Sequence, residues 1–405
     1  MTVESPSEAS LWTGHERGSH EYRRLLAALF CAGVATFAQL YSPQAVLPLI
    51  ARSLHTGAAA SALMVSSSTI GLAVGVIGWS TLADRIGRVK AMSLSVGIAT
   101  VLGLMVPFVP TFQMLLAGRF LEGLALGGVP AIAVAYLTEE VESDHAARAA
   151  GTYVAGTTIG GLLGRLVSAP MAEVLGWRWG MFGVGLLCSA AAVGFIRLAP
   201  TPRGFRPGLG GDGAEGSLGH RLLVNLRSRR RVALYLQGFL LMGGFVAMYN
   251  FLGFRLSAPP FSLPQTVVSL VFVAYLAGTW ASARAGASAT RRGRRPVLLT
   301  SIAVMAVGVV ITLSSNVIAV LIGLVVATAG FFGAHAIASG WTGQLATVGK
   351  AQASSLYNLA YYAGSSIIGW FGGIAFDAAG WAAVATTIVV LAVVAAAAAA
   401  LLLKE

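Results

Sequence analysis

The chain has 405 residues, of which 56% are hydrophobic and only 10% are charged, and its formal net charge is +12. A soluble domain carries about 25% charged residues, so this composition excludes an ordinary soluble fold and makes lipid the expected solvent. The charge does not indicate nucleic-acid binding, because the basic residues lie in short turns between apolar runs rather than on one folded surface.

The first 22 residues are polar and precede the first apolar run. They contain Glu4, Glu8, Glu16 and Glu21 and no apolar centre, so they do not form a cleavable signal sequence. We predict a mobile cytoplasmic tail over residues 1–22.

Six apolar runs follow, each long enough for a membrane-spanning helix, which needs about 20 residues. The predicted helices cover Leu25–Ile50, Ala59–Ala83, Ala91–Val109, Met114–Leu137, Ala149–Leu175 and Gly180–Leu198. They define an N-terminal six-helix bundle over residues 23–198.

A segment rich in Gly, Pro and Arg separates these helices from a second set. We predict a cytoplasmic linker over residues 199–231, with a short surface helix at His220–Asn225. The second set of predicted helices covers Val232–Leu252, Val267–Ala285, Val297–Leu313, Val317–Gln344, Ala353–Asp377 and Ala382–Leu403. It defines a C-terminal six-helix bundle over residues 232–405.

The predicted fold is therefore an all-α membrane protein with twelve transmembrane helices in two pseudo-symmetric bundles. Strands are not expected, because the apolar runs are long and lack period-two alternation. Of the 27 Lys and Arg residues, 22 fall on the side that holds both termini and the linker. This bias predicts cytoplasmic termini in the plasma (inner) membrane.

Two phrases repeat at about half the length of the chain. Ala83–Lys90 (ADRIGRVK) corresponds to Ala289–Pro296 (ATRRGRRP) at an offset of 206 residues. A second phrase begins at Tyr153 and again at Tyr357, an offset of 204 residues. Two phrases with nearly equal offsets indicate a duplicated membrane protein.

These phrases resemble the major facilitator superfamily. The stretch Ser80–Lys90 is similar to the signature loop between its helices 2 and 3, and Gly286–Arg294 to the weaker copy between helices 8 and 9. The phrase Arg119–Gly123 (RFLEG) resembles a helix 4 motif of the drug-efflux branches. Further phrases at Gly156–Arg165 and Gly238–Phe245 are similar to bacterial sugar and drug exporters.

The two basic loops are predicted gating elements. Their residues are Asp84, Arg85, Gly87, Arg88 and Lys90 in the first copy and Arg291, Gly293 and Arg294 in the second. Asp84 is expected to pair with an arginine or a helix N-terminus across the domain boundary, closing the inner side when the site faces outward. The alternative is a turn whose charges only set the orientation.

Three charges fall deep within predicted spans, away from the span ends, where an unpaired charge costs at least about 2.5–3.5 kcal/mol. Arg119 and Glu122 lie one helical turn apart on the fourth span, and Arg165 lies on the fifth. Glu122 is the predicted proton carrier, with Arg119 as its neighbour. Arg165 is expected either to face the central cavity or to neutralise Glu122 from a neighbouring helix. A permanently ionised structural pair is the alternative.

Polar and aromatic residues in the spans are candidates for lining a substrate cavity or for bridging helices. They are Gln39, Tyr41, Gln44, Gln237, Tyr249, Asn250, His335, Tyr357, Asn358 and Tyr361. Small residues at every fourth position predict close helix packing. These are Gly156, Gly160 and Gly164 on one helix, and Gly369 and Gly373 on another.

The sequence contains no phosphate-binding loop, no Cys/His metal spacing and no nucleophile motif, so neither an enzyme nor a cofactor is expected. The resemblance implies a monomeric secondary transporter whose partners are lipid, protons and a small organic solute. Proton-coupled efflux of a drug-like compound or sugar is the favoured interpretation. Helix 5 lacks the Gly-Pro pair of many family antiporters, so import by symport or facilitated diffusion stays open. A membrane sensor that binds solute without moving it is a further alternative.

Overall fold

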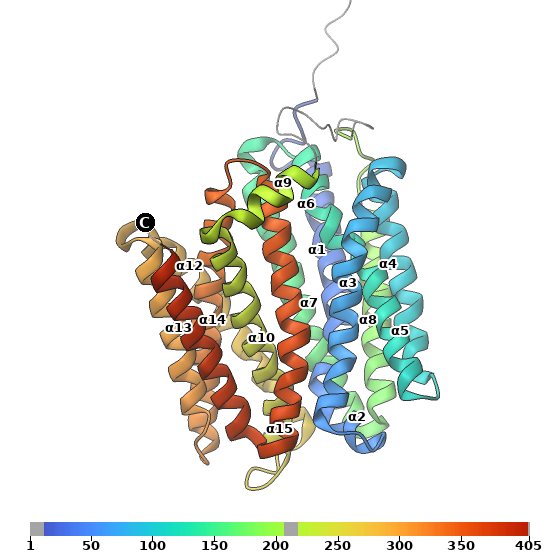
Figure 1. Ribbon diagram of the computed structural model, residues 1–405. Coiled ribbons are helices and arrows are strands. Elements are labelled where there is room, and N and C mark those ends of the chain that lie inside the picture. The colour runs from blue at the N-terminus through green and yellow to red at the C-terminus, as the bar shows by residue number, and fades with distance from the viewer. Residues whose placement is uncertain (1–11, 206–217, 404–405) are drawn as a thin grey trace, which may run out of the picture.

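The computed structural model describes residues 12–205 and 218–403, and every regular element in these ranges is helical. Long helices lie side by side and run between two faces (Figure 1). We call the face that holds α9 (Leu218–Arg227) the terminal face, because the first and last long helices, α1 (His20–Tyr41) and α15 (Lys350–Leu402), begin and end on that side (Figure 1). The other end, which holds α2 (Leu47–Ser53), is the opposite face.

The described residues of the first half form eight α-helices and two short 3₁₀ segments. In order they are α1 (His20–Tyr41), η1 (Gln44–Val46), α2, α3 (Ala58–Ile86), α4 (Arg88–Met105), η2 (Val106–Phe108), α5 (Phe112–Leu126), α6 (Gly128–Glu140), α7 (Ser143–Leu175) and α8 (Trp177–Leu198). The linker contributes α9, which is longer than the predicted surface helix. The linker residues 206–217 lie outside the described ranges.

The described part of the second half has fewer and longer elements. It contains α10 (Arg229–Ser257), α11 (Gln265–Ser269), η3 (Leu270–Ala274), α12 (Tyr275–Arg292), α13 (Arg294–Ile311), α14 (Val317–Leu345) and α15 (Lys350–Leu402). The backbone of α15 is non-helical at Ala379 and Gly380, where two predicted spans meet.

Ten helical stretches of the described residues are long and apolar enough to cross a membrane. The 33-residue helix α7 is not one of them, and α15 is counted once although it is interrupted. Helices of each half pack mainly on one another: α1 on α7 and α8, and α10 on α15. The pair α3 and α15 brings the two halves together.

The distribution of side chains is inverted relative to a soluble protein. Large apolar side chains such as Ile77, Val174 and Leu401 are more than 70% exposed. Polar side chains such as Gln39, Gln44 and Asn250 are at most 2% exposed. Exposed apolar surface on this scale marks contact with lipid, while the buried polar groups must find partners inside the fold.

The first predicted span is not one continuous helix. The helix α1 ends at Tyr41, and the chain continues through η1 into α2. Pro43 explains the break, because it has no N–H to bond the carbonyl oxygen of Gln39. The fourth predicted span is likewise divided into α5 and α6 at Gly127.

Glycine with positive φ forms the turn in both copies of the basic loop. Gly87 has φ 94° and ψ 154°, and Gly293 has φ 84° and ψ 159°. Each glycine ends one helix and begins the next, so a sharp turn needs only one residue that favours this backbone region. The two loops therefore share a backbone conformation as well as a sequence.

The predicted packing glycines lie where helices approach closely. A Cβ atom on Gly156, Gly160 or Gly164 would come within 2.6 Å of backbone atoms of α1. A Cβ on Gly373 would lie 2.3 Å from the Cα of Ala59, across the two halves. The contact at Gly369 is looser, 3.3 Å from Val246 Cγ1.

The prediction of a mobile N-terminal tail is wrong for residues 12–19. Trp12 Nε1 donates to the carbonyl oxygen of Glu139, and the backbone N–H of His15 donates to that of Glu140 at 2.7 Å. The segment therefore packs on the end of α6 before α1 begins, and residues 1–11 lie outside the described ranges.

Candidate functional site

Three charged side chains lie inside the helical layer, and the structure places them in two separate centres. Arg119 and Glu122 on α5, and Arg165 on α7, are each at most 2% exposed. Arg119 and Glu122 form an ion pair of 2.7 Å. Arg165 contacts other residues, so the expectation that it pairs with Glu122 does not hold in this conformation.

Arg119 joins three helices through one guanidinium. Besides Glu122, it donates from Nη1 to Gln39 O (3.2 Å), from Nη2 to Leu40 O (2.7 Å) and from Nε to Met64 O (3.1 Å). Two of these carbonyls belong to the last turn of α1, just before the break at Pro43. Arg119 therefore supplies the donor for Leu40 O at the end of α1, and it shares Gln39 O with the N–H and hydroxyl of Ser42.

Glu122 has one satisfied and one unsatisfied carboxylate oxygen. Oε2 accepts from Arg119, while the buried Oε1 has no hydrogen-bond partner. The neighbouring Gln39 uses its amide N–H to bond the carbonyl oxygen of Ala99 on α4. A buried carboxylate oxygen with an unused lone pair is a chemically suitable proton acceptor.

Arg165 lies in the second centre, which includes residues from both halves of the chain. Its Nε and Nη2 donate to Gln44 Oε1 at 2.8 and 2.5 Å, and Nη1 donates to Gly161 O at 2.6 Å. Nη2 also donates to the Tyr275 hydroxyl of the second half at 3.3 Å. The guanidinium carbon lies 4.3–4.8 Å from the ring centres of Tyr41, Phe272 and Tyr275.

Gln44 connects this arginine to the second half. Its Nε2 donates to Asn250 Oδ1 of α10 at 2.7 Å, while its Oε1 accepts from Arg165. Asn250 Nδ2 is buried and has no hydrogen-bond partner. Tyr41, Gln44, Asn250 and Arg165 therefore form one polar cluster between the halves, which we call the central cluster together with Phe272 and Tyr275.

The other predicted cavity residues belong to different surroundings. Gln237 donates to Ala395 O of α15, and the Tyr249 hydroxyl bonds Thr328 of α14. Both contacts bridge helices of the second half. His335 Nδ1 lies 2.9 Å from the Tyr357 hydroxyl, and its ring packs against Tyr361 at 4.9 Å. Asn358 is exposed.

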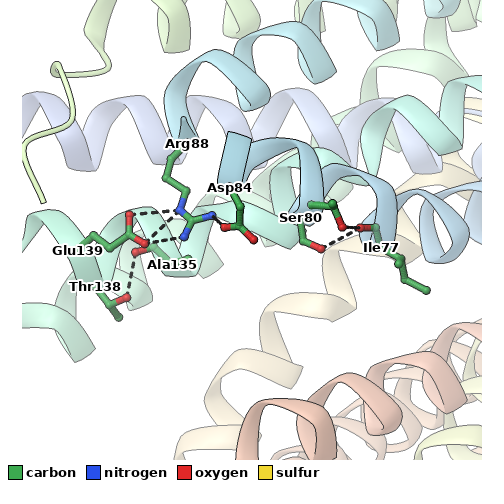
Figure 2. Close-up of polar contacts among 8 residues, drawn as sticks. Ile77, Ser80, Asp84, Arg88, Ala135, Thr138 and Glu139 are labelled. Atoms are coloured by element: carbon green, nitrogen blue, oxygen red, sulfur yellow. Dashed lines mark hydrogen bonds and ion pairs between the residues drawn. The ribbon is translucent and has the colours of Figure 1, made fainter. Parts of the chain in front are cut away.

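The first basic loop forms an ion-pair cluster on the terminal face (Figure 2). Arg88 Nη1 bonds Asp84 Oδ1 at 2.6 Å, and Nη2 bonds Glu139 Oε1 of α6 at 2.8 Å. Asp84 is 56% exposed and is bonded within its own loop. A bond from Asp84 to the second half, as expected for a closed inner side, is not part of this conformation within the described residues, and the gating role stays a prediction.

The second basic loop borders a pocket of about 640 Å³ that opens at the terminal face. Gly293 and Arg294 line it together with Arg230, Thr290 and Gln344. Among the described residues that line this pocket, none is acidic. The pocket is therefore a positively charged recess in the second half.

Two carboxylates connect the halves at the opposite face. Asp377 of α15 accepts from the backbone N–H groups of Ala58 and Ala59, which begin α3, each at 3.0 Å. Glu173 of α7 accepts from the N–H (2.8 Å) and the hydroxyl (2.5 Å) of Thr266, which lies at the start of α11. Each acid binds the positively polarised N-terminus of a helix from the other half. We call these two contacts the outer clasps.

The sequence profile of the Major Facilitator Superfamily matches residues 29–264. The chain belongs to the Major Facilitator Superfamily. It is 38% identical over 369 residues to the inner membrane transport protein YnfM of Escherichia coli, covering 91% of this chain and 88% of that protein. It is 37% identical over 368 residues to the uncharacterized MFS-type transporter YybF of Bacillus subtilis, covering 91% and 90%.

Solved structures of two transporters share the fold. A bacterial homologue of the human lysosomal transporter Spinster superposes with a TM-score of 0.75 at 17% identity, covering 94% of this chain and 97% of that one. The nucleoside transporter NupG gives a TM-score of 0.72 at 14% identity, covering 96% and 100%. The protein is thus a multi-pass membrane transporter and not an enzyme.

Three acidic residues of the site were not predicted from the sequence, because each bonds a residue that lies far away along the chain. Glu139 was not singled out, although it binds Arg88 from 51 residues away. Asp377 and Glu173 had no predicted role, although they lie 204 residues apart, the same offset as the second repeat. That shared offset is the signal that could have identified the outer clasps.

Proposed function

We propose that the protein is a secondary active transporter that exports a small organic solute in exchange for protons. The carrying observation is the Arg119–Glu122 pair, buried inside a membrane-embedded helical layer with Glu122 Oε1 unpartnered. Ionisable groups at such depth are costly and mark ion or substrate pathways.

The surroundings of Arg119 support reversible protonation of Glu122. The guanidinium keeps three backbone carbonyl acceptors, at Gln39, Leu40 and Met64, whether or not Glu122 is charged. Protonation at Oε1 therefore weakens the bond from Arg119 to Oε2 and does not leave the arginine without partners. The alternative role, a permanent structural pair, predicts that neutralising Glu122 destabilises the fold.

We propose that the chain crosses the membrane twelve times. Ten spans meet the length and hydropathy criteria, α7 adds one, and the interruption of α15 at Ala379 and Gly380 adds another. The proposed bundles are residues 23–198 and 232–405, joined by the linker 199–231. The excess of Lys and Arg near the terminal face supports a cytoplasmic location for both termini and the linker.

The proposed mechanism is alternating access with the two bundles rocking about the central cluster. The outer clasps bond the halves at the opposite face, and Gln265 Nε2 of α11 adds a bond to Ala45 O. We infer that this conformation is closed toward the outside. Both halves of the central cluster come from one chain, which supports a functional monomer.

Weakening the outer clasps should favour the outward-open state. Replacing Asp377 with Asn and Glu173 with Gln removes the charges that bind the two helix N-termini. We expect labelling of a cysteine at Ser66, which is buried between the halves, to accelerate roughly threefold or more in intact cells. The probe is a membrane-impermeant maleimide in a background where Cys31 and Cys188 are serine.

The matched control for this labelling experiment is Glu21→Gln, an exposed acid in the first turn of α1 near the terminal face. It should leave the labelling rate at that of the parent protein. Unchanged labelling in the Asp377→Asn, Glu173→Gln double variant would show that these contacts do not hold the outer face closed.

Transport direction and coupling are tested in everted membrane vesicles that contain the full chain. A pH gradient with an acidic vesicle interior is imposed, and a panel of labelled organic solutes is added outside. We expect at least one solute of the panel to accumulate inside the vesicles. A protonophore should abolish this accumulation. Proton symport is the alternative, and it predicts loss of solute from loaded vesicles under the same gradient. Solute binding without flux in either direction would support a sensor and contradict the proposal.

A further inference from the structure

Arg165 is a buried cation whose described contacts include no carboxylate. Its hydrogen-bond acceptors are the Gln44 amide oxygen, the Gly161 carbonyl and the Tyr275 hydroxyl. Its three ring neighbours supply only the weak attraction of aromatic faces. Arg119, at similar burial, has the carboxylate of Glu122 at 2.7 Å. The central cluster therefore keeps an excess positive charge in a membrane interior.

An unpartnered donor lies in the same cluster. Asn250 is 1% exposed, and its Nδ2 has no hydrogen-bond partner. It is linked to Arg165 through the two ends of Gln44, whose amide fills the space between them. Buried donors without acceptors are rare in folded proteins, so this one indicates a missing acceptor.

We propose that the central cluster binds the carboxylate of an organic anion. The carboxylate takes the place of Gln44 Oε1 on the guanidinium fork and also accepts from Asn250 Nδ2 and the Tyr275 hydroxyl. A planar carboxylate matches the paired N–H groups of arginine, which a neutral amide oxygen fills only in part. This proposal rests on the transport function proposed above and adds the class of substrate.

The rings of the cluster favour an aromatic or otherwise flat anion. Tyr41, Phe272 and Tyr275 surround the guanidinium, and Phe245 continues the aromatic surface at 5.3 Å from Tyr275. Aromatic faces and edges pack well on a flat apolar body whose charged end meets the arginine. An inorganic anion would gain nothing from these rings.

The charge of the terminal-face pocket agrees with an anionic solute. Arg230 and Arg294 line this pocket, and the described lining residues include no acid. A recess with one sign of charge raises the local concentration of the opposite ion. An anion approaching from the proposed cytoplasmic side would therefore meet attraction before it reaches the membrane interior.

The test compares a carboxylate with its neutral amide on the purified full chain in lipid nanodiscs. The probes are 1-naphthoate, 1-naphthamide and inorganic phosphate, and the readouts are equilibrium binding and the shift of the melting temperature. We expect naphthoate to bind and to raise the melting temperature, and naphthamide and phosphate to do neither. Equal binding of naphthoate and naphthamide, or no naphthoate binding at all, would overturn the proposal.

Two variants assign the binding to Arg165. Gln44→Glu places a carboxylate on the guanidinium in the same shape as the native amide, so naphthoate should bind at least about tenfold more weakly while the melting temperature stays or rises. Arg165→Lys keeps the charge but loses the fork, and it should also weaken naphthoate binding. The control is Arg284→Gln, an exposed arginine that lies over Trp280 at 4.8 Å. It should bind naphthoate like the parent protein.

The outcome for the site is separable from the outcome for transport. If Gln44→Glu binds naphthoate as tightly as the parent protein, the anion site is wrong, whatever the vesicles transport. If naphthoate binding depends on Arg165 and Gln44 as described but no solute moves under a proton gradient, the site stands and proton-coupled export fails.

Discussion

Replacing Arg119 with leucine should prevent the protein from accumulating in a folded form in the membrane. The change leaves Glu122 as an unpaired charge at 1% exposure and removes a donor from three backbone carbonyls. Loss of one partner of a buried pair costs about 3–5 kcal/mol. Because natural proteins are stable by only about 5–15 kcal/mol, this loss alone is a large fraction of the total.

The measurement for Arg119→Leu is the amount of monodisperse protein after detergent extraction, followed by its melting temperature. Arg284→Leu is the matched control, because it removes an exposed arginine from α12. Combining Arg119→Leu with Glu122→Leu should recover part of the loss, since the unpaired charge disappears while Leu40 O still lacks the donor that Arg119 supplied. A stable, monodisperse single variant would show that the guanidinium does not join α1, α3 and α5 as described.

The architecture was predictable because its causes are local in the sequence. Lipid requires long apolar helices with few charges, so the composition and the turns between apolar runs located most of the helices. Gly87 and Gly293 recur in the two copies of the basic phrase, and the structure shows why a glycine suits both positions, since each has the positive φ of the turn.

The break in the first span was visible in the sequence but was not predicted. Pro43 interrupts an otherwise apolar run, and hydropathy alone does not register a missing N–H group. The consequence is non-local, because Leu40 O at the end of α1 accepts from Arg119, which lies 79 residues further along the chain. The early end of α1 therefore accounts for the burial of Arg119, because the arginine bonds a carbonyl oxygen at that end.

Which charges meet could not be predicted, because pairing depends on how distant helices are arranged. The sequence placed Arg119, Glu122 and Arg165 at depth, but both arginines were reasonable partners for one acid. The structure separates them, since Arg165 lies against Gln44 and Tyr275. The N-terminal segment was mispredicted for a similar reason, because the acceptors of Trp12 and His15 lie on α6.

Replacing Glu122 with Gln should abolish proton-coupled transport and leave the folded protein intact. The amide oxygen can still accept from Arg119, and the three backbone carbonyls still hold the guanidinium. The side chain can no longer exchange a proton, so an imposed pH gradient has no means of driving solute uphill.

The measurement for Glu122→Gln is solute accumulation in everted vesicles at several pH gradients, together with exchange of labelled against unlabelled solute. Accumulation should fall to the equilibrium level at every gradient, while exchange continues, because exchange needs the conformational change but no net proton movement. Glu21→Gln, an exposed acid on α1, should behave like the parent protein in both assays. Gradient-driven accumulation that persists in Glu122→Gln would assign proton coupling to another group. Loss of folded protein would instead favour the permanent structural pair, because it would mean that the negative charge itself stabilises α5 against Arg119.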